Sequence, residues 1–462
     1  MLQKIAIAAG FITLKLKSRD IALAGAGQKA IILMLSAILL YLLFHFRTPS
    51  RLTLLGDMDS ALANAFCHAS ILAAGMFLIS FAYRIVLWLK YRPMRCGAEG
   101  AELPPAVVVI PAYNEGRMVQ NSIVSALFAD YPDKRIICVD DGSSDDTFAY
   151  MEEARRIAPE KIELIRLPRN MGKRRALYAG IKKGIGDFRA AGVDGIIITL
   201  DSDTIIERDA LKNIAAPFAQ NPKTGAVAGK IKVFNKDCSL ITRMLSVRYI
   251  LGFDFTRAYQ SMLKTVFCCP GAFTAYRASA IEPHLDGWLE QTFLGKHCTN
   301  GDDHSLTNFV LSGNSDVLYQ SNAVAYTVVP HTYKKLCRMY LRWARSNIRE
   351  SLRYLGFSMK RLAVTKTMLA FLDGYIHFLS IPLRYCMLLF SYLLILNNFE
   401  LIFRTFAAGT LVAALYSIFY LKSEKSSDFI YGFLYSFFSI IALQWIYPYA
   451  GITLRSNRWL TR

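Results

Sequence analysis

The sequence predicts an α/β domain with a mostly parallel sheet and helices on both faces, embedded between transmembrane α-helices. Two observations lead to this fold class. Between residues 90 and 364, short β-branched runs alternate with amphipathic stretches, as they do where helices connect parallel strands. On both sides of that region, long apolar segments carry no Asp, Glu, Lys or Arg. The 462 residues are 53% hydrophobic with a mean hydropathy of +0.28, which is high for a soluble protein.

The apolar segments are long enough to suggest membrane spans, since one span needs about 20 mostly apolar residues. These segments are 30–46, 60–83, 374–399 (with Arg384 inside), 405–421 and 429–454. We expect two spans before the polar region and three or four after it. The last segment is long for one span and short for two, so we expect a bent hairpin at Pro448. Buried helices of a large soluble core are the alternative.

The basic residues predict the orientation of these spans. Lysines and arginines precede the first span and follow the second, and only Arg47 and Arg51 lie between the two. The positive-inside rule then places the N-terminus and the polar region in the cytoplasm, in a multi-pass protein of the cell (inner or plasma) membrane. Cytosolic loops facing an anionic leaflet explain much of the net charge of +19, which also suits an acidic, phosphorylated substrate. No groove-like repeat of basic and aromatic residues suggests nucleic-acid binding.

Four parts follow from these patterns. Residues 1–92 hold an N-terminal segment and two transmembrane helices, and 93–330 form a cytosolic α/β domain. Residues 331–364 form amphipathic interfacial helices, and 365–462 form the C-terminal transmembrane block with a basic tail. Nine cysteines without a CxxC pair are expected to be reduced thiols.

Polar, acidic stretches follow three of the predicted strands. We expect strands at 107–110, 136–139, 162–166 and 196–200, with helices at 118–128, 145–156 and 173–183. Ligands bind beyond the carboxyl ends of such strands. Those ends carry PAYNEG (111–116), DDGSSDDT (140–147) and DSDT (201–204). Converging carboxylates need a cation or donor groups, and Asp-x-Asp suits Mg²⁺ or Mn²⁺ completed by phosphate oxygens. A cap or turn is the alternative for any one of them, and Asp145 is expected to be an N-cap.

Two further stretches carry chemistry. PRNMGKRRAL (168–177) places Lys173 and Arg174 at a glycine-led helix start, which suits a diphosphate; a solvated basic face is the alternative. NGDDHSLTN (300–308) places two adjacent carboxylates, Asp302 and Asp303, behind a glycine, for which a surface turn is the simple interpretation.

Seven ordered motifs resemble those of processive family-2 glycosyltransferases, most closely the hyaluronan synthases and the nodulation-type chitin-oligosaccharide synthases. The motifs are PAYNEG, VDDGSSDDT, NMGKRRA, DSDT, CCPGAFTAYR (268–277), GDDHSLTN and LRWARSNIRE (341–350). The terminal NRWLTR (457–462) is similar to the Trp-Gly-Thr-Arg tail of that group, with Leu460 where glycine is usual. The resemblance implies a GT-A catalytic domain and a hexosyltransferase activity of the EC 2.4.1 type.

The resemblance implies roles for residues at the nucleotide end. Asp140 and Asp141 would hold the uridine and ribose of a UDP-sugar, with Tyr113 near the base and Glu115 beside it. The resemblance also implies roles for the residues that would face the diphosphate and the cation. Lys173 and Arg174 would bind the diphosphate, Asp201 would face the cation (Mn²⁺ or Mg²⁺), and Asp203 would be its direct ligand.

At the acceptor end, Asp303 matches the family's catalytic base, and Asp302 would orient the site. Arg342 would hold pyrophosphate and Trp343 would stack on an acceptor sugar. Cys268 and Gly271 would belong to the acceptor loop.

This sequence departs from the family pattern mainly on the acceptor side. Met339 stands where the family has Gln, His304-Ser305 replaces Arg-His, and CCPGAF replaces a Ser-Gly-Pro-like loop. Methionine lacks the amide's donor and acceptor, so a different acceptor sugar is compatible with this end.

Three functions follow as alternatives. The first is a processive synthase that polymerises UDP-GlcNAc, alone or alternating with UDP-GlcA, and translocates the polysaccharide. Its partners would be the UDP-sugar, the growing polysaccharide, membrane lipids and other polysaccharide-secretion proteins. The second is a non-processive transferase acting on a lipid-linked or short acceptor, which product length distinguishes. The third is a transporter or receptor with Asp373, Arg384 and Arg404 along its path. The sequence fixes neither the sugars, the linkage, the chain length nor the oligomeric state.

Overall fold

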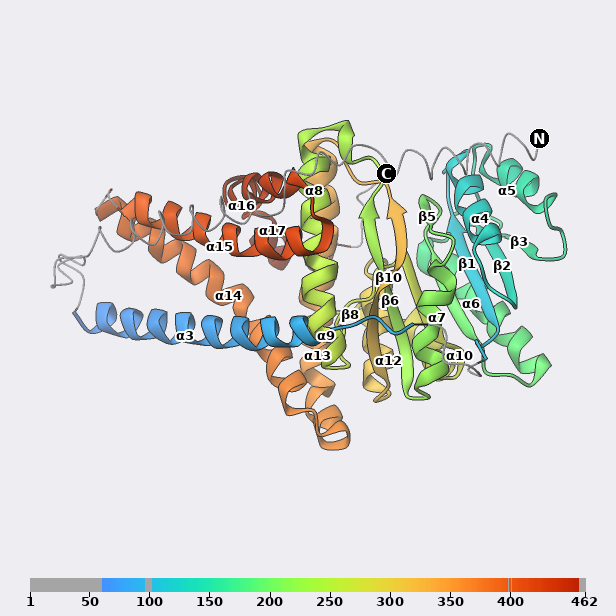
Figure 1. Cartoon of the computed structure of the whole chain (residues 1–462), viewed down its shortest axis with the longest axis horizontal. Helices are drawn as coiled ribbons and strands as arrows, with labels where there is room; N and C mark the ends of the chain where they lie inside the picture. Colours follow the sequence, from blue (N-terminus) through green and yellow to red (C-terminus); the bar gives the residue numbers. More distant parts are fainter. Residues whose placement is uncertain (1–59, 96–101, 398, 400, 457–462) are drawn as a thin grey trace.

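The computed structural model describes residues 60–95, 102–397, 399 and 401–456. An α/β domain lies at one end of the molecule and long helices extend from the other (Figure 1). The predicted span at 30–46 and the terminal NRWLTR motif lie outside the described residues.

The α/β domain is built on an eight-stranded sheet in the order β3-β2-β1-β4-β7-β6-β10-β5. Its strands are β1 (Ala106–Ala112), β2 (Lys134–Asp140), β3 (Ile162–Arg166), β4 (Ile196–Leu200), β5 (Thr204–Ile206), β6 (Thr224–Val233), β7 (Phe273–Arg277) and β10 (Asp316–Thr327). The first four pair in parallel, as do β6 and β10, whereas β7 and β5 run antiparallel to their neighbours. The predicted, mainly parallel sheet is therefore confirmed, and its antiparallel members are additions.

Helices pack against this sheet and connect its strands. They are α4 (Met118–Phe128), α5 (Thr147–Arg155), α6 (Lys173–Ala191), α7 (Ala210–Gln220), α10 (Ala278–Ile281), α11 (Leu285–Leu289) and α12 (Asp302–Ser312). The three predicted helices are present, and α6 continues to Ala191. Gly180 lets α6 approach the sheet, because a Cβ there would lie 2.5 Å from Val109 Cγ1. A short hairpin, β8 (Thr292–Phe293) and β9 (Lys296–His297), precedes α12.

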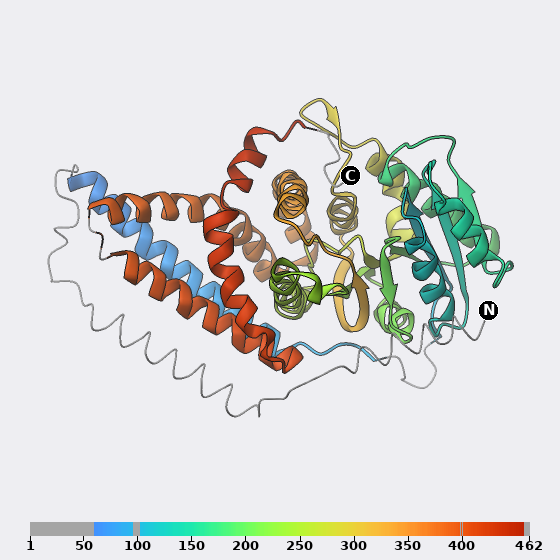
Figure 2. The same ribbon diagram turned by 90° about the horizontal axis from the view of Figure 1, so that it is seen from above.

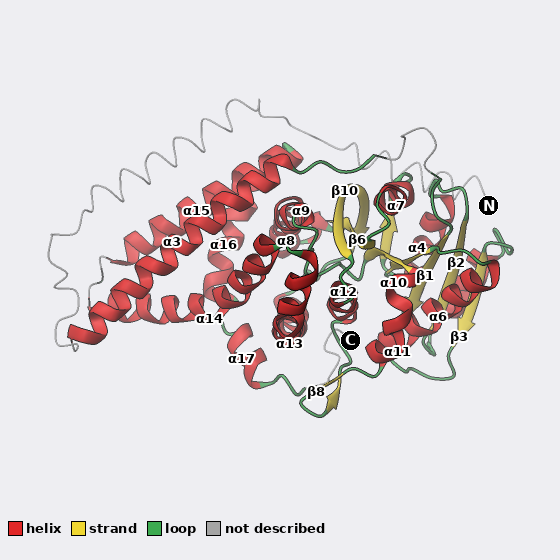
Figure 3. Ribbon diagram, turned by 90° about the horizontal axis from the view of Figure 1, so that it is seen from below, coloured by secondary structure: helices red, strands yellow, loops and turns green. Residues whose placement is uncertain are grey.

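Two helical columns, upright in Figure 1 and seen end-on in Figure 3, separate the sheet from the long helices. One column joins α8 (Leu240–Ile250), the π-helix η3 (Leu251–Arg257) and α9 (Ala258–Met262). The other is α13 (Tyr333–Thr365), which contains the predicted amphipathic helix. π-helical turns are rare and often mark functional sites, and η3 faces the cavity described below.

The long helices project away from the sheet (Figure 2). They are α3 (Ser60–Lys90), α14 (Met368–Asn397) and α15 (Leu401–Glu424). Two shorter helices follow, α16 (Ile430–Ala442) and α17 (Ile446–Ile452), and α17 packs against α13. Across the described residues, no single helix satisfies the length and hydropathy expected of a membrane-crossing helix. The pair 427–442 and 446–452, bent by 45°, satisfies them jointly, by length and composition only.

The predicted hairpin at Pro448 is corrected by this geometry. The chain bends by 45° between residues 442 and 446 rather than reversing at the proline. Pro448 lies in the first turn of α17, where a missing N–H costs the helix no internal hydrogen bond.

Two of the three charged residues assigned to a transport path are placed by the structure. Asp373 is fully buried and pairs with Arg84 of α3 at 2.7 Å, which joins α3 to α14. Arg384 lines the cavity described below. The side chain of Arg404 lies outside the described residues.

A buried ion cluster ties α15 to the α/β domain. Lys230 of β6 lies 2.6 Å from Asp254 of η3 and 3.0 Å from Glu424 at the end of α15. Lys232 lies 2.9 Å from the other oxygen of Glu424. Burial alone would raise the pKa of Glu424, but the two lysines outweigh it and hold that pKa below the ordinary 4.5.

The lowered pKa of Glu424 predicts an acid-sensitive contribution to stability. The contribution is fully present above the ordinary pKa of 4.5 and is lost as the pH falls through the lower folded value. Between about pH 5 and pH 3, the Tm of the wild type should therefore fall more steeply than that of Glu424→Gln, which should already be less stable at neutral pH. Thermal denaturation of both proteins across this range measures the difference. Parallel curves would contradict the assignment.

Candidate active site

A cavity of about 680 Å³ lies between the sheet and the two helical columns. Nine of the predicted site residues line it: Lys173, Asp201, Asp203, Cys268, Gly271, Asp302, Asp303, Arg342 and Trp343. They come from α6, the loop after β4, the loop before β7, the start of α12 and the first half of α13. The remaining five, Tyr113, Glu115, Asp140, Asp141 and Arg174, lie outside the cavity wall.

The loops after β1 and β2 are fastened to each other beside this cavity. The backbone N–H of Asn114 donates to Ser143 Oγ at 3.0 Å, and Asn114 Oδ1 accepts from the N–H of Ser144 at 2.9 Å. The backbone N–H of Glu115 donates to Thr147 Oγ1 at 2.8 Å. Tyr113 and Glu115 are half-buried in this double loop. The predicted N-cap is shifted by one residue: Asp146 precedes α5, while Asp145 accepts from the N–H of Thr147 at 3.0 Å.

Asp140 and Asp141 are both buried but have different surroundings. Asp140 accepts from the N–H of Ser143 at 3.0 Å and pairs with Arg166 at 3.2 Å. Asp141 accepts from the N–H groups of Met171 and Gly172, at 2.7 and 2.9 Å. Asp141 therefore holds the loop that leads into Lys173, so the structure connects the predicted nucleotide loops to the predicted diphosphate site.

Two neighbouring carboxylates lie after β4. Asp201 Oδ1 lies 2.5 Å from Lys173 Nζ. Asp203 accepts hydrogen bonds from the hydroxyls of Thr204 and Thr327, at 3.2 and 3.3 Å. Burial and the charge of Asp201 raise the pKa of Asp203 to about 6. The negative charges of Asp201 and Asp203 repel each other, and a bound cation would relieve this repulsion.

This pair fits a divalent cation whose coordination the substrate completes. Among the residues that the structure describes, no group of three or more His, Cys, Asp and Glu side chains could hold a metal ion alone. Mg²⁺ in nucleotide enzymes is usually held by one or two carboxylates together with substrate phosphates and waters. Hard oxygen donors of this kind also suit Mn²⁺.

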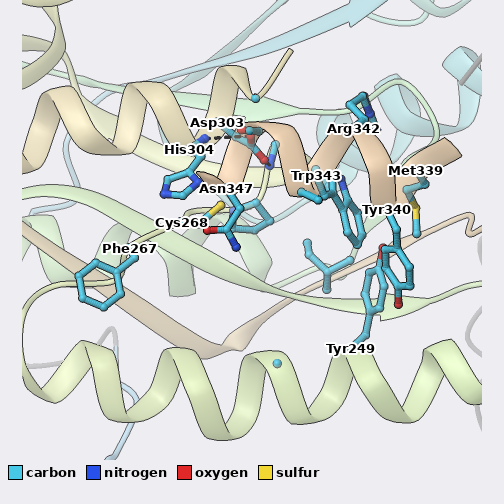
Figure 4. Close-up of a pocket in the computed structure, with 18 of the residues that line it drawn as sticks. Tyr249, Phe267, Cys268, Asp303, His304, Met339, Tyr340, Arg342, Trp343 and Asn347 are labelled. Carbon is cyan, nitrogen blue, oxygen red and sulfur yellow. Dashed lines mark hydrogen bonds between the residues drawn. The ribbon is translucent and has the colours of Figure 1, made fainter. Parts of the chain in front are cut away.

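The pair of aspartates after Gly301 begins a buried helix rather than a surface turn. Gly301 has a φ of +74°, and α12 starts at Asp302. Asp303 Oδ2 accepts from the N–H of Gly271 at 3.0 Å, and Oδ1 accepts from the N–H of His304 at 2.8 Å. These N–H groups and the helix N-terminus stabilise the charged carboxylate and orient it in the cavity (Figure 4).

Gly271 lies close to both Asp303 and Lys173. A Cβ at this position would lie 3.5 Å from Asp303 Oδ2 and 3.6 Å from Lys173 Nζ. Cys268 of the same loop also lines the cavity, and burial holds the pKa of its thiol well above the ordinary value.

Arg174 differs from its predicted role. It is buried, and its Nε lies 3.3 Å from Asp302 Oδ1. Its Nη1 donates to the carbonyl of Trp288 at 2.9 Å and to Gln291 Oε1 at 3.0 Å. Arg174 thus holds Asp302 from behind, whereas Lys173, the preceding residue on the helix, points into the cavity.

An aromatic group occupies the other side of the cavity (Figure 4). Trp343 is 41% exposed, and its ring lies 5.5 Å from that of Tyr340 and 6.3 Å from that of Tyr249. The hydroxyls of Tyr340 and Tyr435 lie 2.9 Å apart, which joins α13 to α16. Such a group offers both a stacking face and hydroxyls, as sugar binding requires.

Several residues of this wall were not predicted: Arg248, Tyr249, Tyr435, Tyr447 and His377. They lie on helices without a recognisable motif, so only their aromatic or basic character could have drawn attention to them. Met339 also lines the cavity, and it packs in an apolar cluster with Leu443 and Ile446. That packing explains a methionine in place of the family's glutamine.

Comparisons with known proteins show which family this chain belongs to. Residues 107–285 match the model of Glycosyl transferase family 2. The chain is 33% identical over 282 residues to an N-acetylglucosaminyltransferase of Rhizobium meliloti (strain 1021), covering 59% of this chain and 64% of the relative. It is 32% identical over 285 residues to one of Azorhizobium caulinodans, covering 60% and 70%.

A solved mannosyltransferase from Pyrobaculum calidifontis, in complex with GDP-Man and Mn²⁺, is 19% identical with a TM-score of 0.46. The match covers 75% of this chain and 96% of that one. The chain spans 55–64% of the length of several of the rhizobial relatives that it matches. From the match to the Azorhizobium enzyme and the family model together, the chain belongs to glycosyl transferase family 2 and is a glycosyltransferase of the hexosyltransferase class.

Proposed function

We propose that this protein is a membrane-embedded, processive, inverting β-glycosyltransferase with a GT-A catalytic domain. It adds GlcNAc from UDP-GlcNAc, alone or alternating with GlcA from UDP-GlcA, to a growing polysaccharide and translocates the product. The observation that carries the proposal is one cavity that holds the aspartate pair after β4, the carboxylate of Asp303 and the ring of Trp343. The rhizobial relatives are N-acetylglucosaminyltransferases, which supports GlcNAc as the donor sugar.

The donor side of the cavity suits a nucleoside diphosphate. Lys173 offers its ammonium group next to Asp201, at the N-terminus of α6, where backbone N–H groups favour phosphate. Asp201 and Asp203 would hold Mg²⁺ or Mn²⁺, which supplies positive charge where the departing diphosphate gains negative charge. The neighbouring loops after β1 and β2 would take the uridine, with Asp140 at the base.

The side of the cavity where the acceptor sugar would bind carries the general base. Asp303 takes the proton of the acceptor hydroxyl as that oxygen bonds to the anomeric carbon, and the bond from this carbon to UDP breaks on the opposite face. The N–H groups of Gly271 and His304 donate to the carboxylate and aim it into the cavity. Asp302, held by Arg174, fixes the first turn of α12 below it.

The aromatic wall suits retention of a growing chain. Stacking on Trp343 would keep the terminal sugar near Asp303 between additions, with Arg342 beside it in the cavity wall. A non-processive transferase that acts on a lipid-linked or short acceptor would use the same chemistry. Membership of the glycosyltransferase family excludes the transporter or receptor without chemistry.

A membrane location is supported by apolar side chains that the long helices leave exposed. Ile79 of α3 is 71% exposed, Leu389 and Leu396 of α14 are 62% and 65% exposed, and Ile441 of α16 is 83% exposed. Exposed apolar side chains on several helices are typical of contact with a membrane or another protein. We place these helices in the cell membrane, with the catalytic domain on its cytoplasmic side, where the basic flanks favour it.

Purified protein in nanodiscs with Mn²⁺ or Mg²⁺ tests the proposal. UDP-GlcNAc, UDP-GlcA, UDP-Glc and UDP-Gal are offered singly and in pairs, and UDP release and product size are measured. We expect a polymer from UDP-GlcNAc, either alone or only together with UDP-GlcA. Short or lipid-linked products would favour the non-processive alternative. Release of UDP only from donors other than UDP-GlcNAc would contradict the assigned sugar.

A further inference from the structure

We propose that Glu350 of α13 is a positioning residue that holds the start of α12, and with it Asp303, in place relative to the acceptor-binding part of α13. This inference rests on the proposed function, because it concerns the alignment of the base with the acceptor. Glu350 does not line the cavity, so it acts through other residues.

Glu350 is fully buried and holds three donors. Its Oε1 accepts from Gln291 Nε2 and from Arg349 Nε, both at 2.9 Å. Its Oε2 accepts from Asn308 Nδ2 at 3.1 Å, and its backbone carbonyl accepts from the same amide at 2.9 Å. A buried charge is tolerated only when it is paired and hydrogen-bonded, and Glu350 meets both conditions.

These contacts reach the base helix by two routes. Directly, Asn308 lies on α12, less than two turns after Asp303. Indirectly, Gln291 Oε1 accepts from Ser305 Oγ of α12 at 2.6 Å and from Arg174 Nη1 at 3.0 Å. Since Arg174 pairs with Asp302, Glu350 is connected to Asp302 and to the helix that carries Asp303.

The same residue belongs to the helix that carries the acceptor platform. Glu350 follows Trp343 by seven residues, which is close to two turns and about 10 Å along α13 on the same face. Arg349, beside it, donates to the carbonyl of Asn300, just before Gly301. The structure therefore links acceptor helix and base helix through one carboxylate.

The carboxylate of Glu350 is ionised in this setting. Burial alone would raise its pKa, but the charges of Arg349 and His304 and the hydrogen bonds from Arg349 and Gln291 hold the pKa below its ordinary value. An isosteric amide cannot reproduce this pattern, because its NH₂ group would face a donor of Gln291, Asn308 or Arg349. Glu350→Gln should therefore shift the start of α12 while the residues that line the cavity stay present.

Glu350→Gln tests the inference through a separation of kcat from KM. We expect its kcat with UDP-GlcNAc to fall about 10- to 100-fold, because a displacement of about 1 Å at the base is enough for such a loss. The donor KM should stay within about threefold of the wild type, because Glu350 does not contact the donor side. Rates are normalised to the fraction of protein that binds UDP, so that misfolded protein does not contribute.

Two further variants separate positioning from a merely structural role. Glu424→Gln removes another paired carboxylate, which is partly buried and lies outside the cavity wall, and should lower the Tm while leaving the normalised kcat within about twofold of the wild type. The double variant Glu350→Gln/Gln291→Glu exchanges carboxylate and amide across their hydrogen bond. It removes the conflict with Gln291 but leaves the one with Arg349, so it should regain part of the kcat that Glu350→Gln loses if the contact itself positions the base.

The outcomes distinguish this inference from the proposed function. A wild type that turns over donor, with a Glu350→Gln variant of equal normalised kcat, would overturn the inference alone. A loss matched by Glu424→Gln would also overturn it. A wild type without turnover of any donor would overturn the proposed function, and the inference with it.

Discussion

Replacing Asp303 with asparagine is expected to lower kcat for sugar transfer about 1,000-fold while leaving the affinity for UDP-GlcNAc unchanged. The amide cannot accept the proton of the acceptor hydroxyl at neutral pH. The donor groups, Lys173 and the aspartates after β4, come from other elements and should stay in place. UDP release measures transfer, and titration with UDP-GlcNAc measures donor binding.

Asp286→Asn is a matched control for this experiment. Asp286 is exposed on α11, outside the cavity, and accepts from the hydroxyl of Tyr178 at 2.6 Å. Its replacement should change neither kcat nor donor affinity by more than about twofold, as is usual for surface substitutions. Transfer by Asp303→Asn within about tenfold of the wild type would remove Asp303 from the role of base.

The second large effect is expected from Gly301→Ala, which should lower the free energy of unfolding by about 2–5 kcal/mol. Gly301 has a φ of +74°, a left-handed conformation that costs alanine about 1–2 kcal/mol. A Cβ there would also lie 1.8 Å from Ser346 Oγ and 2.6 Å from Ser346 Cβ, so the start of α12 or α13 must move. Thermal or denaturant unfolding measures the loss.

The double variant Gly301→Ala/Ser346→Gly separates the two causes. Compared with Ser346→Gly alone, it removes the steric conflict and keeps the left-handed backbone, so the remaining loss should be about 1–2 kcal/mol. A Gly301→Ala protein as stable as the wild type would show that the two helices do not approach this closely.

Strands β1 to β4 could be predicted from the sequence, whereas β5, β6, β7 and β10 could not. Strands β1 to β4 are short β-branched runs, each between turn residues or a helix. In contrast, β6 reads TGAVAGKIKV, in which glycines and lysines weaken the strand pattern. It forms because β7 and β10 pair with it on either side, and those partners are distant in the chain. Long-range pairing of this kind leaves little local signal.

The candidate site was predictable where motifs follow strand ends, and less so on helices. Lys173 and Arg174 are adjacent on α6 and therefore point about 100° apart, so they need not face the same cavity. The sequence does not say which one does, and the structure places Lys173 in the cavity and Arg174 behind Asp302. Glu350 was missed for a related reason: an acidic residue among arginines on an amphipathic helix resembles a solvated face.

The anomeric configuration of the first bond formed from UDP-GlcNAc tests the central claim most directly. The claim is that Asp303 removes the acceptor proton while UDP leaves from the opposite face, in a single displacement. Because UDP-GlcNAc is an α-linked donor, NMR of the wild-type product should then show a β linkage. An α-linked product would mean retention of configuration, and would contradict both the single displacement and the role assigned to Asp303.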